Sequence, residues 1–292
     1  MRIKDALWLL LFLCLSSFSS DLRAESGDWQ RVSDGLYLGQ FSWSEKAGLL
    51  DHPITILKID PKMYSLRLLC ASEYGGTPRT TKQWCLEFGL LAAINASMYR
   101  QQDPLKSTGY MINYLHVNNS HINPAFGAFM VFNPVSSSLP EVQIIDRYVQ
   151  ENWRDTIGRY HSVVQNYRMI SNGKKMGWPQ QDKIYRTAAI GLDRDGRILF
   201  ILSRSPYSTH DFIHGLLSLP IGIRDAMYVE GGVEASLYYR ISGKETEMHA
   251  RETEKNFTAT DHDSAWAVPN VIGVVKRGET PGAALNPSLP KR

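Results

Sequence analysis

The pattern of hydrophobic residues along the chain predicts strands more often than helices. Residues 54–60 (ITILKID) and 64–70 (YSLRLLC) are rich in β-branched and aliphatic side chains, and a Pro-Lys-Met turn separates them. Later apolar runs have the same character. We expect further strands at residues 90–95, 109–117, 126–132, 161–170, 187–193, 197–203, 226–229 and 235–239.

Two shorter stretches predict helices. Thr80 or Thr81 is placed to cap a helix that ends at Gly89, and Ser208 is placed to cap another, with Asp211 completing a capping box. A majority of strands, with a few helices in mixed order and no clear linker, predicts one α+β domain. We expect a mixed, strand-rich twisted sheet flanked by these helices.

The two ends of the chain differ from this pattern. Arg2 and Lys4 precede an apolar run at residues 7–15, and small and polar residues follow, which is typical of a secretory signal peptide. We assign residues 1–24 to the signal peptide, 28–276 to the domain and 277–292 to a loose tail. The apolar run is shorter than the ~20 residues that span a bilayer. The sequence therefore predicts an exported protein, periplasmic or extracellular, of bacterial type and without a permanent membrane span.

The cysteines bear on the redox state of the exported chain. Of the three cysteines, Cys14 lies in the signal peptide, which leaves Cys70 and Cys85. In an oxidising compartment this pair predicts a disulfide. The alternative is two buried free thiols.

Charge and motifs exclude several classes of function. The formal net charge of +3 is spread along the chain, and without a basic run we expect no nucleic-acid partner. The G-x-S-x-G, P-loop and dinucleotide-binding motifs are absent. His210 and His214 stand four residues apart on the second helix, but nothing near them matches a metal-binding motif, so we predict no metal site there.

Three other places in the chain combine polar side chains with strand ends. Asn95 ends a buried strand, Arg186 leads into one, and Glu230 ends another just before Gly231 and Gly232. A guanidinium at a sheet edge is suited to two phosphate oxygens, and a carboxylate beside a glycine pair can act as acid, base or nucleophile. Each place also has a structural interpretation. Asn95 could bond a turn, Arg186 could form a surface salt bridge, and Glu230 could be solvated at a turn.

Taken in order, these places resemble the phosphodiester glycosidase family. Residues 95–99 (NASMY) are similar to the family's Asn-Ala-Gly-Met-Phe, and residues 109–119 to its glycine-led segment with an asparagine-rich turn. Residues 186–196 resemble its Arg-Thr-Ala-x-Gly strand and following hairpin. Residues 230–236 (EGGVEAS) correspond to its Asp-Gly-Gly-Gly-Ser-Ser. The resemblance covers residues 90–275.

The resemblance implies hydrolysis of the glycosidic bond of sugar-1-phosphodiesters, in a small molecule or a phosphosugar polymer. Glu230 would supply the carboxylate as base or nucleophile, Arg186 would grip the phosphate, and Asn95 and Tyr99 would orient the substrate. Trp178 falls in a segment where relatives place a substrate-facing loop. Further substrate contacts are implied for Gly109, Asn118, Gln165, Arg168, Thr187, Gly231, Gly232 and Ser236.

No cofactor is implied, although a divalent cation held by Asp193, Asp195 or Glu234 stays open. Two departures from the family pattern keep a second function open. The usual Asp is Glu230 here, and residues 233–236 replace the glycine-serine run. The alternative is a non-catalytic envelope module that binds phosphosugar or exopolysaccharide chains, and a third is a scaffold without a ligand.

Overall fold

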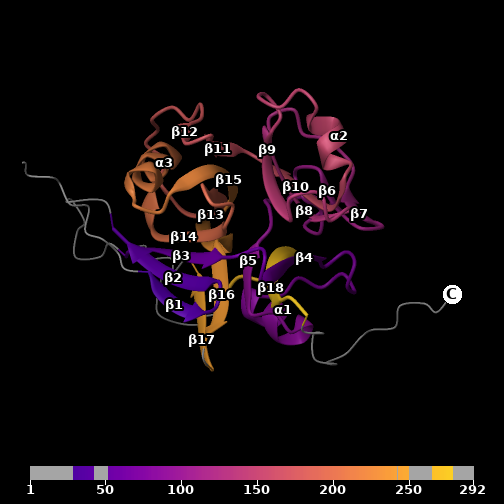
Figure 1. Ribbon diagram of the computed structural model, residues 1–292, viewed down its shortest axis with the longest axis horizontal. Coiled ribbons are helices and arrows are strands. Elements are labelled where there is room, and N and C mark those ends of the chain that lie inside the picture. Colours follow the sequence, from indigo (N-terminus) through magenta and orange to yellow (C-terminus); the bar gives the residue numbers. More distant parts are fainter. Residues whose placement is uncertain (1–28, 43–51, 242, 250–264, 279–292) are drawn as a thin grey trace, which may run out of the picture.

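The computed structural model describes residues 29–42, 52–241, 243–249 and 265–278. The expected signal peptide, residues 1–24, and residues 279–292 of the expected tail lie outside these ranges. The chain is strand-rich with a few helices (Figure 1), which confirms the predicted α+β class. Among the described residues, no helix has the length and apolar character needed to cross a bilayer.

The strands form three sheets in which every pair of neighbours is antiparallel. The eight-stranded sheet has the order β1 (Gln30–Ser33), β2 (Leu36–Phe41), β3 (Ile54–Ile59), β14 (Ile198–Tyr207), β13 (Tyr185–Asp193), β15 (Ile223–Gly231), β11 (Arg168–Ser171), β12 (Lys174–Lys175). A five-stranded sheet has the order β7 (His116–Asn119), β6 (Met111–Asn113), β10 (Tyr160–Asn166), β8 (Ala128–Pro134), β9 (Val142–Asp146). The other five-stranded sheet has the order β17 (Lys244–His249), β16 (Ser236–Ile241), β5 (Ala92–Asn95), β18 (Asn270–Lys276), β4 (Tyr64–Cys70).

One apolar core lies between the three sheets, and a helix covers the other face of each. The central cluster takes side chains from all three sheets, among them Ile190, Val164 and Ile272. Helix α3 (Thr209–Ser218) packs on the eight-stranded sheet, α1 (Thr81–Phe88) on the sheet of β5, and α2 (Trp153–Ile157) on the sheet of β10. Central strands are therefore buried on both faces, which explains why their sequences are continuously apolar.

The predicted helix caps are present. The Thr80 side chain accepts a hydrogen bond from the backbone N–H of Gln83, whose own side chain bonds the Thr80 N–H, and Gly89 ends the helix with a left-handed φ of 64°. Ser208 caps α3 by accepting from the Asp211 N–H, and its hydroxyl donates to the Asp211 carboxylate at 2.8 Å. The Asp211 side chain therefore bonds the Ser208 hydroxyl in place of the Ser208 N–H, and the capping box expected at this helix is not complete.

Two expected strands are each divided in two. Residues 109–117 hold a hairpin of β6 and β7 that turns at Tyr114, which has a φ of 52°. Residues 161–170 contribute to β10 and β11, which belong to different sheets. At the point where the chain changes sheets, Asn166 Nδ2 donates to the Val229 carbonyl of β15 at 3.1 Å, and its Oδ1 accepts the Tyr167 N–H at 2.8 Å.

The disulfide predicted between Cys70 and Cys85 is wrong, since both residues are free and buried. Cys70 belongs to the central core, and Cys85 to the cluster under α1 on the other face of the same sheet. The sheet separates the two sulfur atoms. Burial raises the pKa of both thiols, so neither is an activated nucleophile.

Candidate active site

The neighbouring strands β13 and β15 bring two of the predicted site elements together. Thr187 pairs with Gly231 and Ala188 with Glu230. The register then shifts, so that Val229 is an extra residue in β15. Such a β-bulge redirects the side chains beyond it. The direction of Glu230 therefore follows from the pairing of the two strands, and simple alternation along β15 does not give it.

The carboxyl of Glu230 is held in its protonated form near neutral pH. Its pKa is raised from 4.5 to about 8, mainly by burial and to a smaller extent by the negative charge of Glu234. The Gly231 N–H opposes this effect by donating to Glu230 Oε1 at 3.0 Å. A carboxyl with this pKa can donate a proton at pH 7.

This raised pKa predicts that stability falls as pH rises. Between pH 4.5 and 8 the folded protein holds a proton on Glu230 that the unfolded chain has released, so folding is favoured less with each pH unit. We expect Glu230 to remove roughly 2 kcal/mol of stability between pH 6 and pH 9. Urea unfolding at several pH values measures this. The Glu230→Gln variant should lose this part of the pH dependence, and equal slopes for both proteins would contradict the burial of a protonated carboxyl.

A second carboxylate lies close to the first. Glu234 ends the short helical turn Gly232–Glu234, and the Tyr99 hydroxyl donates to its Oε1 at 3.4 Å. Trp266 Nε1 donates to the same Tyr99 oxygen at 3.1 Å. Burial raises the pKa of Tyr99, the Trp266 hydrogen bond opposes this, and the charges of both glutamates add to the rise. Tyr99 is therefore within electrostatic reach of both carboxyl groups.

Glycine is needed at each of the two positions after Glu230 for a different structural reason. Gly232 has a φ of +74°, a conformation that side-chain-bearing residues rarely adopt. A Cβ on Gly231 would collide with the hydroxyl of Tyr228. The pair thus lets the chain turn from β15 towards Glu234 while it passes directly over the Tyr228 ring.

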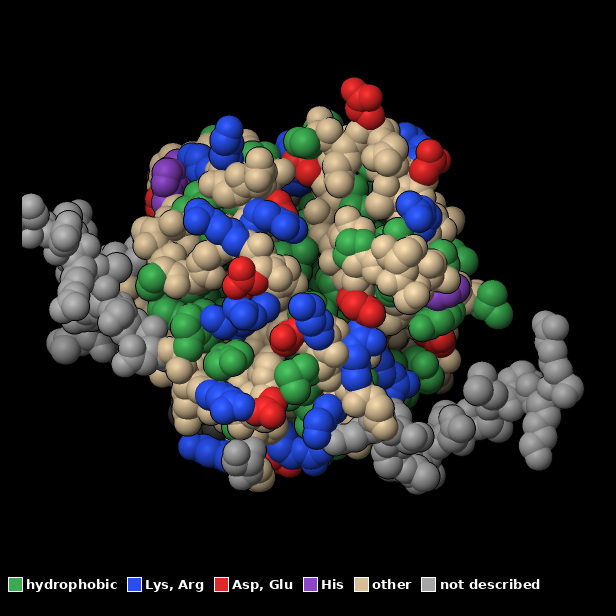
Figure 2. Space-filling model, in the orientation of Figure 1, with side chains coloured by type: hydrophobic (Ala, Val, Ile, Leu, Met, Phe, Trp, Pro, Cys, Tyr) green, Lys and Arg blue, Asp and Glu red, His purple; other side chains and the backbone are tan. Residues whose placement is uncertain are grey.

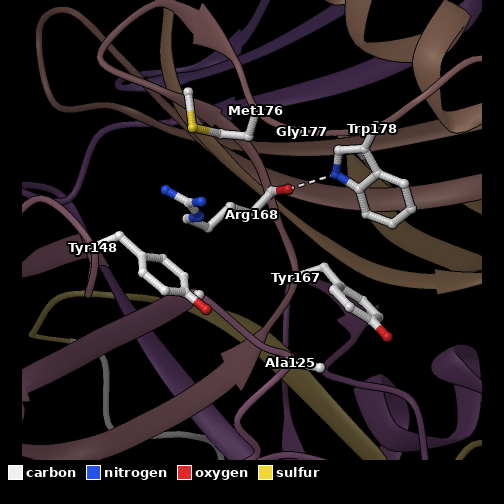
Figure 3. Close-up of a pocket in the computed structure, with 8 residues that line it drawn as sticks. Ala125, Tyr148, Tyr167, Arg168, Met176, Gly177 and Trp178 are labelled. Carbon is white, nitrogen blue, oxygen red and sulfur yellow. Dashed lines mark hydrogen bonds between the residues drawn. The ribbon is translucent and has the colours of Figure 1, made fainter.

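Aromatic side chains line a cavity of about 370 Å³ beside β15. Tyr167 packs edge-on against Trp178 with ring centroids 5.4 Å apart, and the Trp178 ring is 6.2 Å from that of Tyr228. The negative charge of Glu230 contributes to the raised pKa of Tyr228, after burial as the main cause. Tyr228 therefore connects the cavity to the carboxyl site. Figure 3 shows Trp178 Nε1 donating to the carbonyl oxygen of Arg168, at 2.6 Å.

Two of the predicted contacts, Arg168 and Trp178, line this cavity. Arg186 lies instead on β13 next to the glycine pair, and its Nε donates to the Arg204 carbonyl at 2.7 Å. Thr187 is buried, with its hydroxyl 3.5 Å from the Tyr185 carbonyl oxygen.

Asn95 and Ser236 are buried next to one another on adjacent strands. Asn95 is 1% exposed, and its Oδ1 accepts from the Ser236 N–H at 3.3 Å. Asn95 Nδ2 and Ser236 Oγ have no hydrogen-bond partner among the described residues. Unpaired polar atoms in a protein interior are costly, and they concentrate at functional sites.

Three further predicted contacts are tied into the backbone. Asn118 accepts from the Ser107 N–H at 2.8 Å and donates to the Leu105 carbonyl at 2.8 Å. Gly109 packs so tightly that a Cβ would lie 2.5 Å from the Gln165 carbonyl oxygen. Gln165 is fully buried, and its amide makes four hydrogen bonds to main-chain groups. The side chains of Asn118 and Gln165 are therefore bonded to the protein itself, and Gly109 is needed for close packing.

The acidic residues considered for a cation are not gathered together. Asp193 accepts the N–H groups of Asp195 and Arg197 at 2.9 and 2.8 Å, and the Arg197 guanidinium pairs with Asp195 at 2.9 Å. Glu234 lies in a different place, where its Oε1 accepts from the Tyr99 hydroxyl. Among the described residues, no three His, Cys, Asp or Glu side chains form a metal-binding group.

Sequence reasoning missed four aromatic residues of this region: Tyr148, Tyr167, Tyr228 and Trp266. Tyr228 stands two residues before Glu230, but the bulge at Val229 breaks the alternation between them, so their spacing in the sequence carries no signal. Tyr148 and Trp266 carried no local signal, because each meets the site through a long-range contact.

Comparison with known proteins places this geometry in a family. A model of the phosphodiester glycosidase family matches residues 88–275, which is well over half of the chain. The chain belongs to this family. Comparison with curated protein sequences gives no match.

Two solved structures have a similar fold. One is the catalytic domain of zebrafish N-acetylglucosamine-1-phosphodiester alpha-N-acetylglucosaminidase, auto-inhibited by its pro-peptide, with a TM-score of 0.56 and 11% identity over 86% of this chain and 89% of that chain. The other is a hypothetical protein from Synechocystis, with a TM-score of 0.56 and 15% identity over 87% of this chain and 64% of that chain. At these identities the likeness concerns the fold.

Proposed function

We propose that this protein hydrolyses the glycosidic bond of sugar-1-phosphodiesters and releases a free sugar and a phosphomonoester. The observation that carries the proposal is a carboxyl, Glu230, whose pKa of about 8 keeps it protonated beside the second carboxyl group of Glu234. Glycosidases commonly divide acid and base roles between two such carboxyl groups. Family membership supports the same reaction, as does the activity for which the zebrafish neighbour is named.

The reaction can be written with the residues at hand. Glu230 donates its proton to the phosphate oxygen as the bond between that oxygen and the anomeric carbon breaks, and the electron pair leaves with the phosphate. Water adds to the anomeric carbon, and Glu234 accepts the proton that the water gives up. Both carboxyl groups then return to their starting states by exchanging a proton with solvent.

A second arrangement balances equally well. Glu234 attacks the anomeric carbon directly, and water then releases the sugar from the enzyme with Glu230 as the base. The first route inverts the anomeric configuration and the second retains it. The configuration of the first sugar released, followed by NMR, distinguishes them.

Other residues would position the substrate. The rings of Tyr167 and Trp178 offer apolar faces on which a sugar can stack. Tyr99, held by Trp266 and close to both carboxyl groups, would orient the carboxylate of Glu234. Asn95, with an amide N–H₂ that has no partner among the described residues, would donate to a sugar or phosphate oxygen.

We assign to Arg186 the binding of the phosphate group at the cleaved bond, because its strand pairs with β15 beside Gly231. The hydrogen bond from Nε to the Arg204 carbonyl fixes the direction of the guanidinium. Arg186→Lys keeps the charge but loses the planar fork, so we expect KM for a sugar-1-phosphodiester to rise about 10-fold. Steady-state kinetics measure this, with a neutral aryl glycoside as the comparison substrate. An equal rise in KM for the neutral substrate, or no change for either, would remove Arg186 from phosphate binding.

The site of action follows from the predicted signal peptide, which supports a role in the cell envelope. Phosphosugar polymers and smaller sugar phosphates there are the expected substrates. Detection of the processed chain in the periplasm or medium, beginning near residue 25, tests the location.

The function is tested by incubating the mature protein with UDP-N-acetylglucosamine and a panel of sugar-1-phosphodiesters. We expect free sugar in excess of the protein concentration, lost in Glu230→Gln. Binding that saturates at one ligand per protein without turnover would instead support the non-catalytic envelope module, which the altered residues 233–236 keep open. If neither turnover nor binding is observed, the remaining function is that of a scaffold without a ligand.

A further inference from the structure

The guanidinium of Arg168 is fixed in the aromatic cavity by contacts on several sides. Its Nη1 lies 2.6 Å from Asp146 Oδ2 at the end of β9, and its Cζ is 4.4 Å from the centre of the Tyr148 ring. A Cβ on Gly127 would lie 2.6 Å from its Nε and 2.7 Å from Tyr148 Cε2, so any larger residue there would displace one of these side chains. The side chain is 24% exposed. Arg168 is therefore held rigidly but still faces solvent through the cavity.

Part of the donor capacity of Arg168 is unused. Asp146 occupies Nη1, while Nε and Nη2 have no hydrogen-bond partner among the described residues. The guanidinium of Arg147 stands 4.8 Å from the same Tyr148 ring, but its donors go to the Asn123 and Pro124 carbonyls. A cavity in which an arginine keeps N–H donors beside the rings of Tyr167 and Trp178 has the chemistry to bind an anionic group carried on a ring.

The cavity is also separate from the bond proposed to be cleaved. Arg168 pairs with Met227 of β15, three residues before Glu230. At about 3.3 Å per strand residue, the two backbone positions are roughly 10 Å apart along the strand. A phosphate bound at Arg186, next to Gly231, thus occupies a different position from an anion bound at Arg168. A substrate that reaches both arginines would therefore carry two anionic groups.

We propose that the Arg168 cavity is a subsite for a second anionic group of the substrate, a phosphate or a sugar carboxylate, one sugar unit away from the cleaved phosphodiester. This inference rests on the proposed function for the identity of the substrate. It narrows the substrate class to acidic saccharides or polymers with repeated phosphates. Asp146 and Tyr148 are then positioning residues for Arg168.

The subsite is tested with probes that need no hydrolysis. D-Glucuronate and D-glucose share a pyranose ring and differ in one carboxylate, and inorganic phosphate supplies the other anion. Binding to the mature protein is measured by ligand-observed NMR and by tryptophan fluorescence, since Trp178 lines the cavity. We expect glucuronate, phosphate or both to bind at least 10-fold more tightly than glucose. Because phosphate can also bind at Arg186, the anion whose affinity falls more in Arg168→Lys identifies the group that the cavity accepts.

A matched pair of variants locates the binding. Arg168→Lys keeps a charge beside Asp146 but removes the planar fork, and should weaken anion binding at least 10-fold. Arg147→Lys changes the same residue type on the other side of Tyr148, where the donors already bond to carbonyls, and should alter binding less than 2-fold. Thermal unfolding within a few degrees of the wild type establishes that both variants are folded.

Three results would overturn the subsite: glucose binding as tightly as glucuronate, anion binding unchanged in Arg168→Lys, or no anion binding to the wild type at millimolar concentrations. The Glu230→Gln protein separates this inference from the proposed function. If Glu230→Gln still binds the anions, and neither it nor the wild type hydrolyses any substrate tested, the subsite is supported and the proposed hydrolysis is contradicted. If the wild type hydrolyses the substrate but Arg168→Lys does not change anion binding, the proposed function is supported and the subsite is contradicted.

Discussion

Replacing Glu230 with glutamine is expected to lower kcat for a sugar-1-phosphodiester about 10³-fold, the usual contribution of a positioned general acid. Glutamine keeps the size of the side chain and can still accept the Gly231 N–H that now bonds Oε1. What it removes is the proton that burial and the charge of Glu234 hold on the carboxyl. The loss should therefore fall on kcat, with KM nearly unchanged.

The pH profile of the wild type gives a second readout for Glu230. Since the pKa is raised to about 8, kcat/KM should fall as pH rises through this value and the acid loses its proton. An activity that instead increases through pH 8 would assign Glu230 the role of base. Asp225→Asn, an amide for a carboxylate at the other end of β15, is the matched control and should keep kcat within about 3-fold, because Asp225 bonds the Asn172 N–H and Arg224 outside the site.

Replacing Gln165 with alanine is expected to destabilise the protein by about 4 kcal/mol. Gln165 Oε1 accepts the N–H groups of Tyr110 and Asn123 at 3.1 and 2.9 Å, and its Nε2 donates to the carbonyls of Asn123 and Phe126, both at 2.9 Å. The side chain is 0% exposed, so alanine leaves buried main-chain groups without partners, each at about 1–3 kcal/mol. For a domain of this size the melting temperature should fall roughly 10 °C.

This experiment also decides between the two roles of Gln165. The resemblance to the family implies a substrate contact, whereas the hydrogen bonds above describe a structural support for the main chain. A large fall in melting temperature identifies the support. A raised KM with unchanged melting temperature would establish the substrate contact. Gln180→Ala is the control, since this exposed glutamine makes one surface hydrogen bond to Asp211 and should cost less than about 1 kcal/mol.

Local signals in the sequence predicted the local structure well. The cap at Thr80 and the end of the helix at Gly89 depend on residues within one or two turns, so the sequence contains all that is needed. The strands at residues 54–60 and 64–70 were expected for the same reason and are β3 and β4. The break at Tyr167 was not foreseen, because it depends on a hydrogen bond from Asn166 to the distant Val229.

The candidate site divides in the same way. Glu230, its glycine pair and Arg186 stand in motifs that can be recognised in the chain. The pKa of Glu230, however, depends on burial and on Glu234. The aromatic cavity depends on Tyr148 and Trp178, which line one cavity only in the folded protein.

The sequence by itself determined the α+β class, the helix caps and the family. Tertiary structure alone decided the division of strands into three sheets, since strand pairing joins residues that are far apart in the chain. It also decided that a sheet lies between Cys70 and Cys85, which excludes their disulfide. Last, it decided which carboxyl holds a proton at neutral pH. Burial and neighbouring charge control ionisation, and both arise only when distant segments pack together.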